Sequence, residues 1–123
     1  MLKIKLNREY KICNTSEKGD EDFYVKFKFQ PTEDLDLTEV RKKFEDSKDV
    51  VAKNLSVFDV VIRKSIIDTD IVDADTDQII PIKNEDGSIN EYNQKIVMDV
   101  IKMFPDFYDK VWAAYLGPQG KNL

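Results

Sequence analysis

The sequence predicts an α+β fold, in which a small N-terminal antiparallel β-sheet packs against three or four helices. Between residues 23 and 29 apolar residues alternate with more polar ones, which is the period of a half-buried strand. Between 91 and 116 apolar residues recur every three or four positions, as on an amphipathic helix. A chain of 123 residues, 41% of them hydrophobic, can form one core. We therefore expect a single domain over 1–123, β-rich over 1–30 and mainly helical over 31–117.

The β-rich part is expected to be a hairpin or small sheet with one apolar face. Residues 2–6 alternate apolar residues with lysine, which predicts a first strand that resumes at Tyr10 and Ile12 after a short break. The polar stretch around Gly19 predicts a loop before the second, alternating strand. Pro31 ends that strand, because proline cannot donate a hydrogen bond to a neighbouring strand.

The helical part is expected to begin with two helices, over about 38–46 and about 48–64. The second of these carries an apolar stripe at helical spacing, so we expect it to be largely buried. Residues 66–90 lose the helical period and are acidic, which predicts a loop with one or two short extended pieces. Within this loop Asp86-Gly87 predicts a turn.

Two further helices are expected after this acidic loop. Asn90 is a good N-cap for the first of them. Pro105 stops that helix and suits the first turn of the next one. Gly117-Pro118 is expected to end the last helix, because glycine followed by proline is a common C-terminal signal. Residues 118–123 should then form a frayed tail.

The composition excludes much of the usual catalytic chemistry. The chain has no histidine and one cysteine, Cys13, so Ser-His-Asp sites, Cys-His sites and Cys- or His-based zinc sites are excluded. Its four glycines form no phosphate-binding loop. We therefore expect no enzyme, no catalytic residue and no cofactor. The lack of a disulfide pair, a signal peptide and a membrane-spanning run predicts a cytoplasmic protein.

The negative charge is concentrated in one stretch. The chain carries a net charge of −5, and residues 68–91 hold eight acidic residues against one base, Lys83, which makes −7. Such a chain should repel nucleic acid and not bind it. The same carboxylates allow an alternative, in which they imitate the phosphates of DNA and occupy a basic groove on a nucleic-acid enzyme.

A weak calcium motif lies inside the acidic stretch. Asp73, Asp75 and Asp77 match the first three ligand positions of a calcium loop. The match then fails, because Gln78 stands where the turn requires glycine and Asn84 where the loop requires a bidentate glutamate. We retain these aspartates as a weak calcium candidate beside the plainer interpretation of a solvated acidic loop, and we expect no metal site elsewhere.

Aromatic and apolar residues gather near the C-terminus at helical spacing. Such residues most often belong to a core. Tyr108 and Leu116, however, lie off the main stripe, and with Trp112 they could leave an exposed apolar patch that recruits a partner. The residues expected to bind a partner are Phe104, Phe107, Tyr108, Trp112, Tyr115 and Leu116.

The order of these features carries a resemblance. The chain begins with the basic segment Leu2 to Lys11, the strand Phe23 to Phe29 and a helical pair. It continues with the turn Asp86-Gly87-Ser88-Ile89, a helix ending in Phe104-Pro105, the aromatic helix Phe107 to Leu116 and the polar Gly120-Lys121-Asn122. In this arrangement the chain resembles the small tail assembly chaperones of long-tailed bacteriophages, which also occur as prophage tail proteins. It departs from them in the middle, where its acidic segment is longer.

The resemblance implies a non-catalytic protein of the bacterial host cytosol. Chaperones of this family coat the long helical tape-measure protein, prevent its aggregation and help recruit tail-tube subunits. The implied partners are the tape-measure protein and the tail tube protein, with neither nucleic acid nor membrane; self-association is left open. Two alternatives also stay open: a structural tail or connector protein of the virion, and an acidic inhibitor of the DNA-mimic type.

Overall fold

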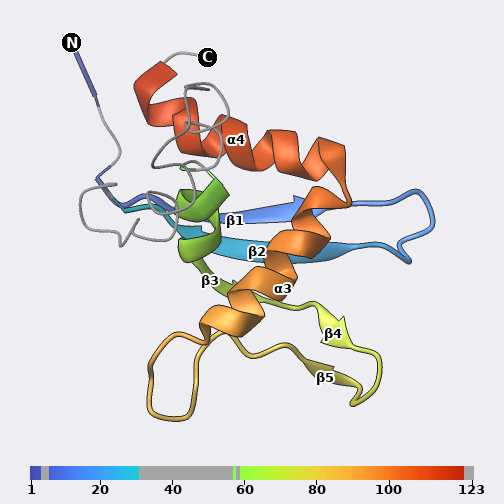
Figure 1. Cartoon of the computed structure of the whole chain (residues 1–123). Helices are drawn as coiled ribbons and strands as arrows, with labels where there is room; N and C mark the ends of the chain where they lie inside the picture. The colour runs from blue at the N-terminus through green and yellow to red at the C-terminus, as the bar shows by residue number, and fades with distance from the viewer. Residues whose placement is uncertain (4–5, 31–56, 58, 121–123) are drawn as a thin grey trace, which may run out of the picture.

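The fold is α+β, as the sequence predicts. A computed structural model describes residues 1–3, 6–30, 57 and 59–120. In these residues a three-stranded sheet lies against helices, and a separate two-stranded hairpin extends beyond it. Figure 1 shows α3 (Glu91–Lys102) passing in front of the sheet and α4 (Pro105–Gly120) running beside it. The hairpin of β4 (Val72–Asp73) and β5 (Gln78–Ile79) lies at the lower right.

The main sheet is antiparallel throughout. Its strands are β1 (Glu9–Asn14), β2 (Phe23–Lys28) and β3 (Ile66–Thr69), in the order β1-β2-β3. Because side chains alternate between the two faces of a strand, Val25 and Phe27 share one face, and both are fully buried. The alternating pattern that predicts β2 is thus the pattern of a strand with one face on the core.

The first predicted strand is wrong in its position. Residues 1–3 and Leu6 form no strand, and residues 4 and 5 lie outside the described residues. The side chain of Leu6 is 86% exposed. The strand begins at Glu9, which pairs with Lys28 in β2. Alternation alone does not make a strand, since the backbone also needs a neighbouring strand to bond with.

Extended pieces are present between 66 and 90 as expected, but there are three of them and not one or two. They are β3, β4 (Val72–Asp73) and β5 (Gln78–Ile79). β4 and β5 form their own antiparallel hairpin. β3 instead joins the N-terminal sheet as its third strand, where it pairs with β2 and buries Ile66.

The predicted start of the helix α3 (Glu91–Lys102) is confirmed. The side chain of Asn90 accepts a hydrogen bond from the backbone N–H of Asn93 at 3.0 Å, as an N-cap does. The helix expected over 38–46 and most of the helix expected over 48–64 lie outside the described residues. Residues 59–64 are helical, which agrees with the second prediction where it can be compared.

The end predicted for the last helix is wrong. The helix α4 (Pro105–Gly120) begins at the expected proline but continues through Gly117 and Pro118. Near this end the guanidinium of Arg8 donates a hydrogen bond to the carbonyl oxygen of Tyr115. A cation is favourable close to the negative end of a helix dipole. This partner comes from the other end of the chain, so the local sequence gives no sign of it.

The core lies between the apolar face of the sheet and the helices. Residues from β2, from helical residues 59–64, from α3 and from α4 form one buried cluster, which includes Val25, Phe27, Phe29, Val61, Ile62, Ile66, Val97, Ile101, Phe107, Val111 and Tyr115. The polar residues buried beside this cluster are Ser65, Thr69 and Gln94. The amide nitrogen of Gln94 donates to the carbonyl oxygens of Ile66 at 2.8 Å and Lys64 at 3.4 Å, and so satisfies backbone groups where the helical residues meet β3.

Candidate partner-binding surface

The hairpin β4–β5 holds an apolar pair at the surface. Val72 pairs with Ile79 across the two strands, and their side chains are 47% and 55% exposed. The next pair inward is closer to the core, because the backbone N–H of Ile80 bonds to the carbonyl oxygen of Ile71 at 2.9 Å and both side chains are partly buried. One face of the hairpin therefore packs on the molecule, while the other presents aliphatic side chains to water.

Local hydrogen bonds hold the turn of this hairpin. The backbone N–H of Asp77 donates to the carbonyl oxygen of Asp73 at 2.8 Å, and a carboxylate oxygen of Asp73 accepts from the N–H of Asp75 at 2.9 Å. Asp77 has a φ of 58°, in the left-handed region that aspartate tolerates better than most residues. The exposed pair is thus carried by a turn with its own hydrogen bonds.

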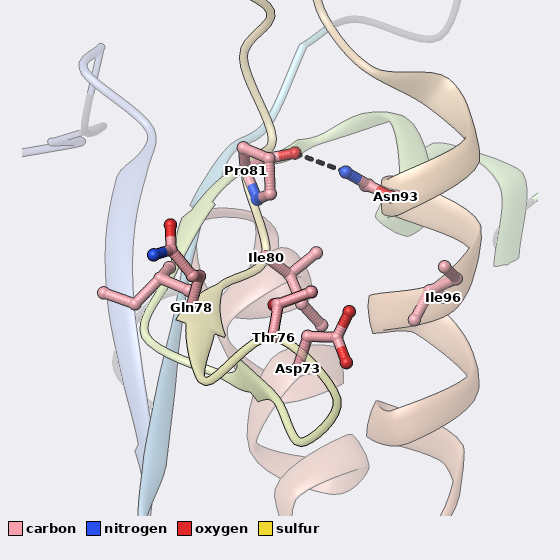
Figure 2. A pocket seen from close by; sticks show the side chains of 8 residues that line it. Asp73, Thr76, Gln78, Ile80, Pro81, Asn93 and Ile96 are labelled. Carbon is pink, nitrogen blue, oxygen red and sulfur yellow. Dashed lines mark hydrogen bonds between the residues drawn. The ribbon is translucent and has the colours of Figure 1, made fainter.

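An open groove of about 800 Å³ separates this hairpin from α3. We call it the hairpin–α3 groove. Figure 2 shows Ile80 reaching from the hairpin towards α3, and Ile96 on the helix across from it. The side-chain amide of Asn93 donates to the carbonyl oxygen of Pro81 at 2.7 Å and ties the helix to the hairpin at one end. The groove is lined by Asp73, Thr76, Gln78, Ile79, Ile80, Pro81, Asn93 and Ile96.

The surroundings of this groove are acidic. Asp73 lines it, and Asp75 and Asp77 are exposed in the adjoining turn. Elsewhere in the acidic segment, in the turn over 84–88, the hydroxyl and the backbone N–H of Ser88 donate to the carboxylate of Asp86, and these bonds hold the pKa of Asp86 below its usual range. An apolar floor with a negative border favours a ligand that is itself apolar and positively charged.

The calcium motif does not form a metal site in the described part of the chain. There, no three His, Cys, Asp or Glu side chains lie close enough together to hold a metal ion. Asp73, Asp75 and Asp77 therefore do not converge as their spacing suggests. The carboxylate of Asp73 is used instead to hold the backbone of its own turn.

The six residues predicted to bind a partner are divided between core and surface. Phe107 and Tyr115 belong to the core, with 0% and 6% exposure. The ring of Phe107 lies 4.9 Å from that of Phe23, and the ring of Tyr115 meets Phe29 edge-on at 5.3 Å. These two rings are used for packing and are not available to a partner. Phe104, Tyr108 and Trp112 are partly buried, and Leu116 is 41% exposed.

Tyr108 takes part in a polar contact that ties three elements together. Its hydroxyl donates to one carboxylate oxygen of Asp59 at 2.5 Å, while the ammonium of Lys102 lies 2.9 Å from the other. Burial, with this hydrogen bond as a second cause, raises the pKa of Tyr108 to about 12. Because Asp59 is in the helical residues 59–64, Lys102 in α3 and Tyr108 in α4, the contact joins helices. The structure thus gives Tyr108 a structural role.

The groove was not predicted from the sequence, although one signal was present. Ile79, Ile80 and Ile82 surround Pro81 as an apolar run inside an acidic segment. An apolar run in an otherwise solvated loop indicates either a buried strand or a contact surface. Only the pairing of β4 with β5 and the position of α3 decide that Ile82 is buried while Ile79 is exposed.

Comparisons of the chain with protein-family models, with curated protein sequences and with solved structures find no match. Within the described ranges, no helix has both the length and the apolar character that crossing a membrane requires.

Proposed function

We propose that this protein is a phage tail assembly chaperone, which binds the tape-measure protein and assists assembly of the tail tube without catalysing a reaction. The identity of the client rests on the resemblance in the order of elements. The mode of action rests on the exposed apolar residues of the hairpin β4–β5 and on the groove beside them. Together these features suit a protein that shields an aggregation-prone helical client in the bacterial cytosol until the tube forms around it.

One observation carries this proposal: the hairpin β4–β5 exposes Val72 and Ile79. Aliphatic side chains that remain half exposed contribute little to folding, and removing them from water is favourable when a partner covers them. They stand beside the hairpin–α3 groove, so a client has both a raised apolar edge and a concave surface to contact.

The acidic surroundings suit a chaperone as well. Negative charge around the contact keeps the protein soluble while an apolar client is bound. The contact surface is modest, so a single copy should bind weakly and be displaced easily. Many copies along one long client would still remain bound together, because neighbouring sites on the same client raise the effective concentration.

Co-expression tests the proposal. The protein should raise the soluble yield of the tape-measure protein encoded beside it and should co-purify with it. Replacing Val72 and Ile79 by threonine keeps the β-branched shape but adds hydroxyls, and it should abolish most of the rescue. The matched control changes two other exposed apolar residues, Leu2 and Leu6, to threonine and should leave rescue intact. If the wild type gives neither rescue nor complex, the proposal is wrong.

Mass spectrometry of purified phage particles separates this function from a structural role in the virion. A chaperone that is displaced as the tube polymerises should be missing from the finished particle. Stoichiometric amounts in the particle would support the structural tail or connector protein in its place.

A further inference from the structure

Helix α3 presents a second apolar stretch in line with the hairpin–α3 groove. Ile96 and Val100 are one turn apart on α3, and Phe104 follows one turn later, just beyond the end of the helix. Ile96 lines the groove already described. Val100 and Phe104 line a second hollow of about 340 Å³. The two hollows therefore follow one another along the same side of α3.

The hairpin forms the opposite wall of both hollows. Ile71 and Val72 line the second hollow, and Ile79 and Ile80 line the first. These four residues are partners across the hairpin, since Val72 pairs with Ile79 and Ile71 bonds to Ile80. The hollows are thus adjacent, and we call them together the α3 channel. From Asn93 to Phe104 it is about 16 Å long, at 1.5 Å per helical residue.

Acidic residues line both hollows of the α3 channel. Asp73 lines the first, and the second is lined by Asp20, Glu21, Asp22 and Asp70; among the described residues, neither hollow is lined by lysine or arginine. Several of these carboxylates are held in place: Asp22 accepts from the backbone N–H of Ser16 at 2.6 Å, and Asp70 from that of Tyr24 at 2.8 Å.

A different side of α3 shows that this arrangement is specific. The hollow bordered by Lys95 and Lys102 also contains Arg63, together with two acidic residues, Asp59 and Asp99. Its charges are mixed, whereas those of the α3 channel have one sign. An apolar floor with negative charge in both hollows is complementary to an apolar segment that also carries positive charge.

We propose that the α3 channel holds one amphipathic helix of about three turns whose apolar face is flanked along its length by Lys or Arg. The apolar residues spaced one turn apart along α3 and the length of the channel match such a helix. This inference rests on the proposed function, because it specifies the chemistry of the client segment. A second copy of this chain is a poorer occupant, since its net charge of −5 opposes an acidic border.

Two synthetic peptides test the inference with the full-length protein. Both are helical, about three turns long, with the same leucine face. One carries lysines along the borders of that face, and the other carries glutamates at the same positions. In fluorescence anisotropy at low salt, the lysine peptide should bind about tenfold more tightly or better. Added salt should reduce the difference, because it screens exposed charges.

Variants locate the binding. Neutralising the border with Glu21→Gln and Asp73→Asn should weaken binding of the lysine peptide by about three- to tenfold. The control Glu85→Gln with Asp99→Asn removes the same charges outside the channel and should change binding by less than about twofold. Ile96→Gln should weaken both peptides, whereas its neighbour Lys95→Gln should not. Circular dichroism confirms that each variant is folded.

The inference is overturned if the two peptides bind equally, if neither binds, or if the control pair loses as much affinity as the border pair. It is also overturned if light scattering shows a dimer that Ile96→Gln dissociates, because the channel then belongs to a second copy. If Ile96→Gln still rescues the tape-measure protein, the proposed function stands and this inference is wrong. If the protein binds the lysine peptide but does not rescue the tape-measure protein, this inference stands and the proposed function is wrong.

Discussion

The strand β2 and the hairpin β4–β5 both alternate side chains between two faces, but only one of them is covered. In β2, Val25 and Phe27 are 0% exposed because α3 and α4 lie over that face. In the hairpin, Val72 and Ile79 are about half exposed. The comparison shows that a strand pattern defines which residues share a face, while the arrival of another element decides whether that face becomes core or contact surface.

The largest expected effect is a loss of stability when a side chain on the covered face of β2 is removed. Phe27→Ala removes a fully buried ring and should lower the free energy of unfolding by about 3–5 kcal/mol. The matched change Ile79→Ala, on the hairpin, should cost only about 0.5 kcal/mol, because the side chain is already half in water. Urea denaturation measures both. Similar losses at the two sites would show that the hairpin is part of the core.

A smaller effect is expected where a polar side chain supports the core. Gln94→Ala should cost about 1–3 kcal/mol, because it leaves the buried carbonyl oxygens of Ile66 and Lys64 without their donor. The exposed neighbour Lys95→Ala should change stability little and serves as the control. A Gln94→Ala protein as stable as the wild type would mean that water replaces the amide.

Removing the N-cap of α3 should lower the stability less than removing Gln94. Asn90→Ala removes the acceptor for the N–H of Asn93 and should cost about 1 kcal/mol of stability. Asn90→Ser keeps an acceptor oxygen and should recover most of it. Because α3 forms one wall of the α3 channel, both variants can be measured for stability and for peptide binding. An unchanged melting temperature in the alanine variant would contradict the capping role.

The smallest effect depends on pH. Tyr108 has a folded-state pKa of about 12, above its ordinary value of 10.0, so its contribution to stability is complete below pH 10 and is lost as the pH rises through about 12. Because the ring is partly exposed, we expect this loss to be only about 1 kcal/mol. Tyr108→Phe should not show it. Urea denaturation of both proteins at pH 9 and pH 11 makes the comparison, and parallel losses would contradict the assignment.

The sequence predicts those elements whose cause is local. The alternation that defines β2 and the cap at Asn90 are both of this kind. The pairing of β3 with β2 could not be predicted, because Ile66 and Ile67 are too short a run to show a period and their partner lies about forty positions earlier. The hydrogen bond from Arg8 to the carbonyl oxygen of Tyr115 in α4 joins residues that are even farther apart in the chain.

The candidate site follows the same division. Helical spacing correctly groups Phe107 with Tyr115, but spacing alone does not tell whether their shared face meets the sheet or a partner. The structure places both against β2 residues and their neighbours. Val72 and Ile79 are exposed because no other described residue covers the outer face of the hairpin. No local sequence pattern encodes the absence of such a cover.

The main sheet joins parts of the chain that leave the ribosome at different times. The hydroxyl of Thr69 donates to the carbonyl oxygen of Tyr24 across 45 positions, and the buried rings of α4 emerge later still. The β1–β2 hairpin is therefore synthesised well before β3 and α4, the described elements that pair with it and pack on its aromatic side chains. A nascent chain that stalls before α4 would lack the rings that pack on Phe23 and Phe29, and it would be exposed to cellular chaperones and proteases.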